Sequence, residues 1–331
     1  MRSHSLLVTV AAVGLVALVA AAPADAHPAP TPTPRGTAWV PVLFEGDGLV
    51  SVVDLASGAV TATIDDGIAY PYATSLSPNG RLLYVTELFA ADVAVVNTAT
   101  RTVVDHIAVG AQPNGVAFSP NGKFAYVTSS VDDSVSVIDV IAGELTSTIT
   151  VGDNPVGVAV SRDGKQVYTA NYGDASASVI TVATGAVASA TVGTKPVGIA
   201  VGERGRVFVA NSESSSVSVL DGRTGAAIVG SPIELEPGAT PEGIAARGNE
   251  VYVGTVGAGS LTVLDGRSLT VKRTLGLGGV WAVAPAGGDF VVAVQPGAPS
   301  VLNVVNSKTG AVVSTTELGT LALGLGNFVG R

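Results

Sequence analysis

The chain has 331 residues, of which 47% are hydrophobic and 13% are charged, and its formal net charge is −9. A negative net charge repels nucleic acid, and the absence of cysteine excludes disulfide bonds, thiol nucleophiles and cysteine metal sites. Length alone would allow two domains, but an unbroken internal repeat predicts one.

The N-terminal segment, residues 1–26, has the pattern of a secretory signal peptide. A short polar start is followed by the uncharged apolar run 6–22 and by the small-residue motif Ala24-Asp25-Ala26. We expect cleavage after Ala26, a secreted or extracellular protein and no stable membrane insertion afterwards. An uncleaved membrane anchor is the alternative, because the run nearly spans a bilayer. Residues 27–36 are then a Pro-rich, extended spacer.

The stretch from Pro113 to Gly152 defines the organisation of the remaining chain. It contains four short apolar runs, at 116–118, 124–128, 134–139 and 145–151, which turn residues separate. This pattern predicts a four-stranded antiparallel meander of about 40 residues, the size of one β-propeller blade. One such sheet cannot bury both faces alone, so it has to be repeated.

Two independent markers each count seven repeats. The bulky residue near the start of the second strand recurs at Trp39, Tyr84, Tyr126, Tyr168, Phe208, Tyr252 and Val291. The turn after the third strand begins at Asp54, Asn97, Asp139, Thr181, Asp221, Asp265 and Asn306. We therefore predict an all-β fold over residues 37–331, a seven-bladed β-propeller of four-stranded antiparallel blades.

Prolines mark where the blades begin. A proline precedes five of the predicted innermost strands, at Pro71, Pro113, Pro155, Pro196 and Pro241, and a glycine follows two residues later in four of them. The innermost strands meet around the axis of the ring, where little room exists for side chains, and glycine allows close approach.

The repeat resembles the YVTN-repeat family of β-propellers. The resemblance rests on Tyr84-Val85-Thr86 and Tyr126-Val127-Thr128, on Ser-Pro-Asn-Gly at 77–80 and 119–122, and on strand ends such as Val137-Ile138-Asp139. The last four units depart from it, since Phe208-Val209-Ala210 replaces Tyr-Val-Thr. The resemblance implies a surface-layer-like or binding propeller and supports the fold more firmly than a function.

The two ends of the chain are predicted to close the ring together. Ala38–Leu43 is the second strand of blade one, and no first strand precedes it. At the other end, Leu321–Leu325 follows the fourth strand of blade seven and has no place there. We expect this C-terminal strand to be the innermost strand of blade one, which leaves no open edge.

One mouth of the central channel is the expected ligand-binding site. The starts of the blades ring this mouth, and the loops after the second strands open on the same face. The candidate ligand-binding residues are Tyr70, Tyr72, Asn114, Asn154, Lys195, Glu242 and Trp281. The aromatic members would stack on a ring or a cationic group, or would fill the channel as a plug.

The charges separate between the two faces. The acidic residues assigned to the mouth face are Glu45, Asp47, Asp65, Asp66, Glu87, Asp92, Asp132, Asp133, Asp153, Asp174, Glu213, Glu236 and Glu242. Lys195 is the only basic residue assigned to this face. The opposite face, which we call the hairpin face, carries the short hairpins between strands one and two and between strands three and four of each blade, and its charge is mixed. Such a field attracts cations, although charged loops also serve solubility. The expected partner is a protein, a peptide or a small molecule, and a cationic ligand suits the field.

A calcium site is the metal-dependent alternative. Propellers similar to the gluconolactonase class hold a divalent ion in the channel with carboxylate and amide oxygens. Here Glu242, Asn114, Asn154 and Asp153 are the candidate Ca²⁺ ligands. With such an ion the protein would be a metal-assisted, lactonase-like hydrolase.

Histidine chemistry is not expected. Beyond the predicted cleavage site the chain has only His27, in the spacer, and His106, in the outer strand 102–109. A serine hydrolase needs a base beside its nucleophile, so we expect neither that chemistry nor a zinc site built on histidine. The function expected first is non-catalytic binding at the acidic mouth. The lactonase-like hydrolase and a structural cell-envelope or surface-layer component remain the alternatives, and self-association would favour the latter.

Overall fold

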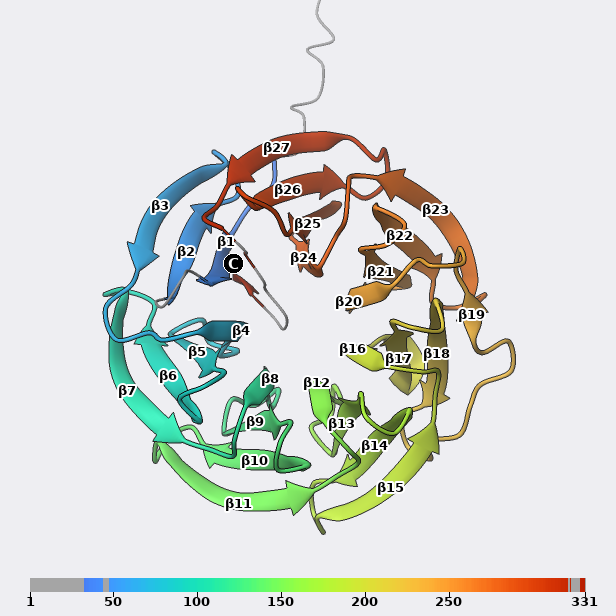
Figure 1. The fold of residues 1–331 in the computed structure, drawn as a ribbon, viewed down its shortest axis with the longest axis horizontal. Coiled ribbons are helices and arrows are strands. Elements are labelled where there is room, and N and C mark those ends of the chain that lie inside the picture. Colours follow the sequence, from blue (N-terminus) through green and yellow to red (C-terminus); the bar gives the residue numbers. More distant parts are fainter. Residues whose placement is uncertain (1–32, 44–47, 321, 323–327, 331) are drawn as a thin grey trace, which may run out of the picture. The chain divides into compact units, whose positions relative to one another are not determined.

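The computed structural model describes residues 33–43, 48–320, 322 and 328–330. The chain divides into two compact units, residues 1–33 and 34–331. The second unit contains seven four-stranded antiparallel sheets arranged around a central axis (Figure 1), which confirms the predicted propeller. The predicted signal peptide and most of the spacer lie outside the described residues. No helix in the described ranges is long and apolar enough to cross a membrane.

Each blade contributes one strand to each of four concentric layers (Figure 1). The innermost strands of blades two to seven are β4 (Pro71–Leu76), β8 (Pro113–Phe118), β12 (Pro155–Val160), β16 (Pro196–Val201), β20 (Pro241–Arg247) and β24 (Ala282–Ala286). The second strands are β1 (Thr37–Leu43), β5 (Leu82–Glu87), β9 (Phe124–Ser129), β13 (Gln166–Asn171), β17 (Arg206–Asn211), β21 (Glu250–Thr255) and β25 (Phe290–Gln295). The predicted prolines therefore begin five of the innermost strands.

The two outer layers complete the blades. The third strands are β2 (Gly48–Asp54), β6 (Asp92–Asn97), β10 (Ser134–Asp139), β14 (Ser176–Thr181), β18 (Ser216–Asp221), β22 (Ser260–Asp265) and β26 (Val301–Asn306). The outermost strands are β3 (Ala59–Ile64), β7 (Thr102–Ala108), β11 (Glu144–Thr150), β15 (Ala186–Thr191), β19 (Ile233–Glu234), β23 (Thr270–Gly276) and β27 (Val312–Glu317). A single 3₁₀ turn, η1 (Glu203–Gly205), precedes β17.

Burial follows the layers. The second and third strands are buried on both faces, because each sheet packs against a neighbouring blade on either side. The outermost strands are largely exposed; in β11 every residue except Ile149 is exposed. This explains why the second and third strands are rich in apolar and small residues, whereas the outermost strands carry exposed threonine, serine and charge.

The ring closes through its C-terminal strand. The strand β28 (Val329–Gly330) pairs antiparallel with β1, and Trp39 donates its backbone N–H to Phe328 O at 2.8 Å. The closure by a C-terminal strand in blade one is therefore confirmed, but its paired residues lie further along the chain than predicted. Of the predicted segment 321–325 the structure describes only Ala322, which bridges to Val42.

One repeat marker is wrong by a residue. In blade two Leu82 pairs with Asn97, and Tyr84 follows Leu82 by two residues. In blade seven Phe290 pairs with Asn306, so the equivalent residue, two positions after Phe290, is Val292. Val291 was predicted from sequence spacing. In a strand a one-residue shift moves the side chain to the opposite face, so Val292, and not Val291, corresponds to the repeat tyrosines.

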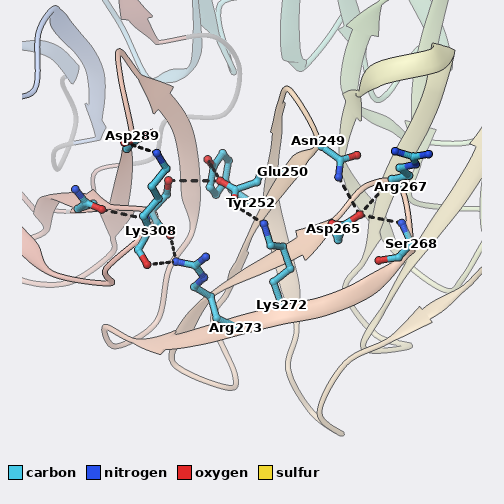
Figure 2. Close-up of polar contacts among 12 residues, drawn as sticks. Asn249, Glu250, Tyr252, Asp265, Arg267, Ser268, Lys272, Arg273, Asp289 and Lys308 are labelled. Carbon is cyan, nitrogen blue, oxygen red and sulfur yellow. Dashed lines mark hydrogen bonds and ion pairs between the residues drawn. The ribbon is translucent and has the colours of Figure 1, made fainter.

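Polar contacts join blades six and seven on the hairpin face (Figure 2). Lys272 Nζ lies 2.8 Å from Glu250 Oε1, and Tyr252 donates its hydroxyl to Glu250 Oε2 at 2.8 Å. Arg273 of blade six donates to the backbone oxygens of Ser307 and Lys308 in blade seven. The mixed charge expected on this face therefore includes contacts that hold neighbouring blades together.

Candidate functional site

A ring of structurally equivalent residues lies at the mouth of the channel. Each member of the ring is the residue just before the glycine or alanine at which the innermost strands of two neighbouring blades approach each other most closely. A Cβ added to Gly198 would lie 2.3 Å from Glu242 O, and one added to Gly243 would lie 2.5 Å from Trp281 O. We call the following set the mouth ring: Tyr72, Asn114, Val156, Val197, Glu242 and Trp281.

The apolar members of the mouth ring belong to one cluster. Val156 and Val197 are buried, and Tyr72 and Trp281 pack as half-buried side chains against the cluster that contains them. These four residues come from blades two, four, five and seven, which approach one another only near the axis (Figure 1). The aromatic side chains of Tyr72 and Trp281 therefore belong to one apolar cluster that several blades share.

The polar members of the mouth ring are Tyr72, Asn114 and Glu242, and Glu242 is the acidic residue among them. Glu242 is half-buried, burial raises its pKa, and its Oε1 accepts a hydrogen bond of 2.7 Å from Ser212. Burial also raises the pKa of Tyr72 to about 12, and the charge of Glu242 adds to this effect. Tyr72 therefore keeps its proton and is a hydrogen-bond donor at neutral pH.

Trp281 presents a donor without an acceptor. Its indole Nε1 is buried and has no hydrogen-bond partner among the described residues. Buried N–H groups are nearly always paired, and an unpaired one costs free energy that an external acceptor would recover. A donor and a carboxylate thus lie in adjacent blades of the same ring.

Three other predicted ligand-binding residues lie outside the mouth ring, each two residues before one of its members in the chain. Tyr70, Asn154 and Lys195 precede the blade prolines, and each has a left-handed backbone with φ between 51° and 53°. In this conformation their carbonyl groups accept backbone N–H groups from the loop after the second strand of the same blade. Lys195 Nζ lies 4.4 Å from the ring centroid of Tyr172, a cation–π contact on the mouth face.

Several acidic side chains of the mouth face stabilise its loops. Asp132 accepts the backbone N–H of Ala111 at 2.7 Å, and Asp133 accepts that of Asn154 at 2.8 Å. Asp153 is exposed, and its carboxylate lies against Gly173. Of the four candidate Ca²⁺ ligands, Glu242 and Asn114 therefore share the mouth ring, whereas Asp153 packs against the loop after β13.

Below the mouth ring the channel contains a cavity of about 440 Å³. The glycines of the innermost strands and small aliphatic side chains such as Val116 and Ala159 line it, together with Pro78 and Pro285 near the hairpin face. No charged side chain is among the described residues that line it. The cavity therefore continues the channel beneath the mouth ring without a fixed charge.

The structure brings one histidine together with two carboxylates, an arrangement that the sequence did not predict. His106, on β7, lies with its Nδ1 3.0 Å from Glu87 Oε2 and 3.5 Å from Asp92 Oδ2. In the described part of the chain these residues form the one group of three acidic or histidine side chains whose ligand atoms converge. Sequence reasoning missed the group because its members are far apart in the chain and only the strand register brings them together.

Comparison with known proteins supports the fold. The family described as the cytochrome D1 heme domain matches residues 79–187, about a third of the chain and no more than blades two to four. No curated protein matches the chain in sequence.

Several solved structures share the architecture. Kuenenia stuttgartiensis hydrazine synthase has 20% sequence identity, a TM-score of 0.51 and coverage of 77% of this chain and 96% of its own. Virginiamycin B lyase from Staphylococcus aureus has 14% identity, a TM-score of 0.64 and coverage of 75% and 84%. The dihydro-heme d1 dehydrogenase NirN in complex with DHE has 15% identity, a TM-score of 0.62 and coverage of 87% and 76%. At this identity the similarity establishes the propeller fold alone, and membership of the YVTN-repeat family remains a prediction.

Proposed function

We propose that this protein is an exported, non-catalytic binding protein that receives the ammonium group of a ligand at the mouth ring. The observation that carries the proposal is the half-buried carboxylate of Glu242, which shares the ring with the aromatic side chains of Tyr72 and Trp281. A carboxylate next to aromatic rings is the combination that recognises ammonium groups. A bound cation would also relieve the cost of burying this carboxylate.

The ligand-binding solved structures are consistent with this proposal. One similar structure is NirN in complex with DHE, and another is a catalytically inactive variant of the S. aureus lyase with quinupristin. Both are propellers with a bound small molecule. They support the use of the fold for ligand binding, but not the identity of the ligand.

Among the residues that the structure describes, the mouth ring does not fit a heme iron. Its axial ligands in proteins are histidine, cysteine, methionine or tyrosine. Cysteine is absent, the single methionine is Met1, and His106 lies on the outermost strand β7. Tyr72 is the tyrosine of the mouth ring, and its pKa, raised to about 12, disfavours the phenolate that iron would need. We therefore expect added hemin to show no shifted Soret band on mixing with the protein.

Trp281 provides the experiment that tests the proposal. The chain has two tryptophans, and Trp39 lies in the core at 6% exposure, so Trp39→Phe leaves Trp281 as the only tryptophan reporter. Spermidine, added as an ammonium probe at constant ionic strength, should change the Trp281 emission saturably. Glu242→Gln should weaken binding about tenfold or more, because it removes a charged partner.

Glu213→Gln is the matched control. It removes the same charge from the mouth face, but Glu213 is exposed in the loop after β17 and outside the mouth ring. If the two glutamine variants bind spermidine with equal affinity, the binding is general electrostatic attraction to the mouth face, and the proposal is overturned. A parallel titration with CaCl₂ against NaCl at matched ionic strength tests the calcium alternative, because only a specific ion would exceed the screening effect.

A further inference from the structure

We propose that Glu87, Asp92 and His106 form a Zn²⁺ site on the mouth-face edge of blade two, separate from the mouth ring. The three side chains come from β5, β6 and β7, three adjacent strands of one sheet. Their ligand atoms lie within 4.8 Å of one another. We call this group the blade-two triad.

The two distances from His106 are close to those around a tetrahedral ion. With bonds of about 2.0–2.2 Å, the ligand atoms of a tetrahedral zinc site lie roughly 3.3–3.5 Å apart. In the blade-two triad His106 Nδ1 lies 3.0 Å from Glu87 Oε2 and 3.5 Å from Asp92 Oδ2. Small side-chain rotations would therefore place an ion between these atoms. Three protein ligands leave the fourth position to water or to an external ligand.

Glu87 and Asp92 are adjacent acidic side chains with little access to solvent. The side chain of Glu87 is 2% exposed, and besides His106 it accepts the backbone N–H of Ala69. Asp92 Oδ1 is buried and has no hydrogen-bond partner among the described residues. Two adjacent carboxylates repel each other, and within the described ranges His106 is the only basic side chain that pairs with either of them. A divalent cation would neutralise the pair.

The other blades show that the fold does not need these charges. The positions equivalent to Glu87 in blades three to seven are Ser129, Asn171, Asn211, Thr255 and Gln295. In blade four Asn171 Nδ2 donates to the hydroxyls of Ser176 and Ser178 at 2.8 and 2.9 Å. Ser176 is the equivalent of Asp92. In blade four a neutral hydrogen-bond network thus occupies the position that Glu87 and Asp92 occupy in blade two. Among the described residues, blade two alone has two acids and a histidine there.

An ion can reach the blade-two triad from solvent. The His106 side chain is 42% exposed, and it borders a groove of about 500 Å³ between blades one and two. Asp65, Asp66 and Asp105 line the same groove and outnumber Arg101, the basic residue in its lining. Their charges raise the local concentration of cations at the entrance. Binding would also fasten the exposed strand β7 to the buried strands β5 and β6.

The internal repeat also supplies the variant for the test. Glu87→Asn, Asp92→Ser and His106→Thr, combined, give blade two the residue types that other blades use at these positions. The full chain, purified without a histidine tag, would be titrated calorimetrically with ZnCl₂. We expect one equivalent to bind to the wild type and the affinity of the triple variant to fall by about 100-fold, because all three ligands are removed. The matched control is Asp105→Asn, which removes a charge from the groove but no ligand.

Two further measurements keep the outcome unambiguous. Co²⁺ in place of Zn²⁺ should give the visible absorption of tetrahedral coordination in the wild type and in Asp105→Asn, but not in the triple variant. If the triple variant does not fold, His106→Gln, at a side chain that is already partly exposed, takes its place. Zinc binding that is equal in the wild type and the ligand variants would overturn the proposal, because residual sites such as His4 and His27 are present in all of them.

Discussion

Thr128 Oγ1 donates a hydrogen bond of 2.7 Å to the carbonyl oxygen of Val156, in the innermost strand of the next blade. The same hydroxyl accepts the backbone N–H of Gly115 at 2.8 Å in its own blade. Thr86 makes the equivalent pair of contacts with Asn114 and Ala73. The threonine of the Tyr-Val-Thr repeat therefore links neighbouring blades at the register shift of the innermost strand, where the ladder leaves backbone groups unpaired.

Removing this hydroxyl should destabilise the ring. Thr128→Val keeps the shape of the side chain but leaves the Gly115 N–H and the Val156 carbonyl without partners, at a cost of about 2 kcal/mol. Urea unfolding monitored by circular dichroism would measure the loss. Thr150→Val, at an exposed position of β11, is the control and should change the free energy of unfolding by less than about 0.5 kcal/mol. Equal losses in the two variants would contradict this role for Thr128.

Close packing of the innermost strands leads to a second prediction. A Cβ on Gly157 would lie 2.3 Å from Val197 O, so Gly157→Ala has to push two blades apart. We expect a loss of about 3 kcal/mol in the free energy of unfolding. In contrast, a Cβ on Gly276 of β23 would meet no atom within 4 Å, so Gly276→Ala should be neutral or slightly stabilising. A Gly157→Ala protein as stable as the wild type would show that the blades separate without cost.

The closing strand is the third test. Phe328 is fully buried and belongs to the core between blades seven and one, together with Ala38 and Ala284. Phe328→Ala should cost about 4 kcal/mol, because it leaves a cavity at the seam of the ring. Val313→Ala on the exposed face of β27 is the control and should cost less than about 1 kcal/mol. Removal of residues 319–331 should lower the melting temperature further, since it exposes the edge of β1.

Glu242 predicts a pH dependence of stability. Burial raises its pKa in the folded state above 4.5, so the folded protein binds a proton more tightly than the unfolded chain. The stability linked to this proton is fully present below pH 4.5 and is lost as the pH rises through the raised pKa. Relative to Glu242→Gln, the wild type should therefore lose stability between pH 4 and pH 8. Melting temperatures of both proteins across this range would measure the change, and a constant difference would contradict the assignment.

Export remains a prediction from the N-terminal sequence. Cleavage after Ala26 would leave His27 as the first residue of the mature protein. Intact mass spectrometry of the culture supernatant would identify this product. A protein that retains residues 6–22 in the membrane fraction would instead support the anchor alternative.

The sequence alone determined the number of blades and the place of nearly every strand. These features are local, because alternation with a period of two and turn residues recur within about 40 residues, and the repeat supplies the same evidence seven times. The prolines that begin the innermost strands and the unusual entry of the chain at the second strand of blade one could be predicted for the same reason. Where the repeat weakened, in blade seven, the prediction failed by one residue.

Only the tertiary structure decided which side chains meet. Closure of the ring places Tyr72 and Trp281, separated by most of the chain, in one ring, whereas Tyr70, Asn154 and Lys195 lie outside it because they precede the innermost strands. The strand register of blade two brings His106 to Glu87 and Asp92, a contact that no spacing along the chain reveals. The physical reason is that a propeller repeats its backbone but not its side chains. Its sites therefore arise from contacts between strands and blades, which depend on the register and the closure of the whole ring.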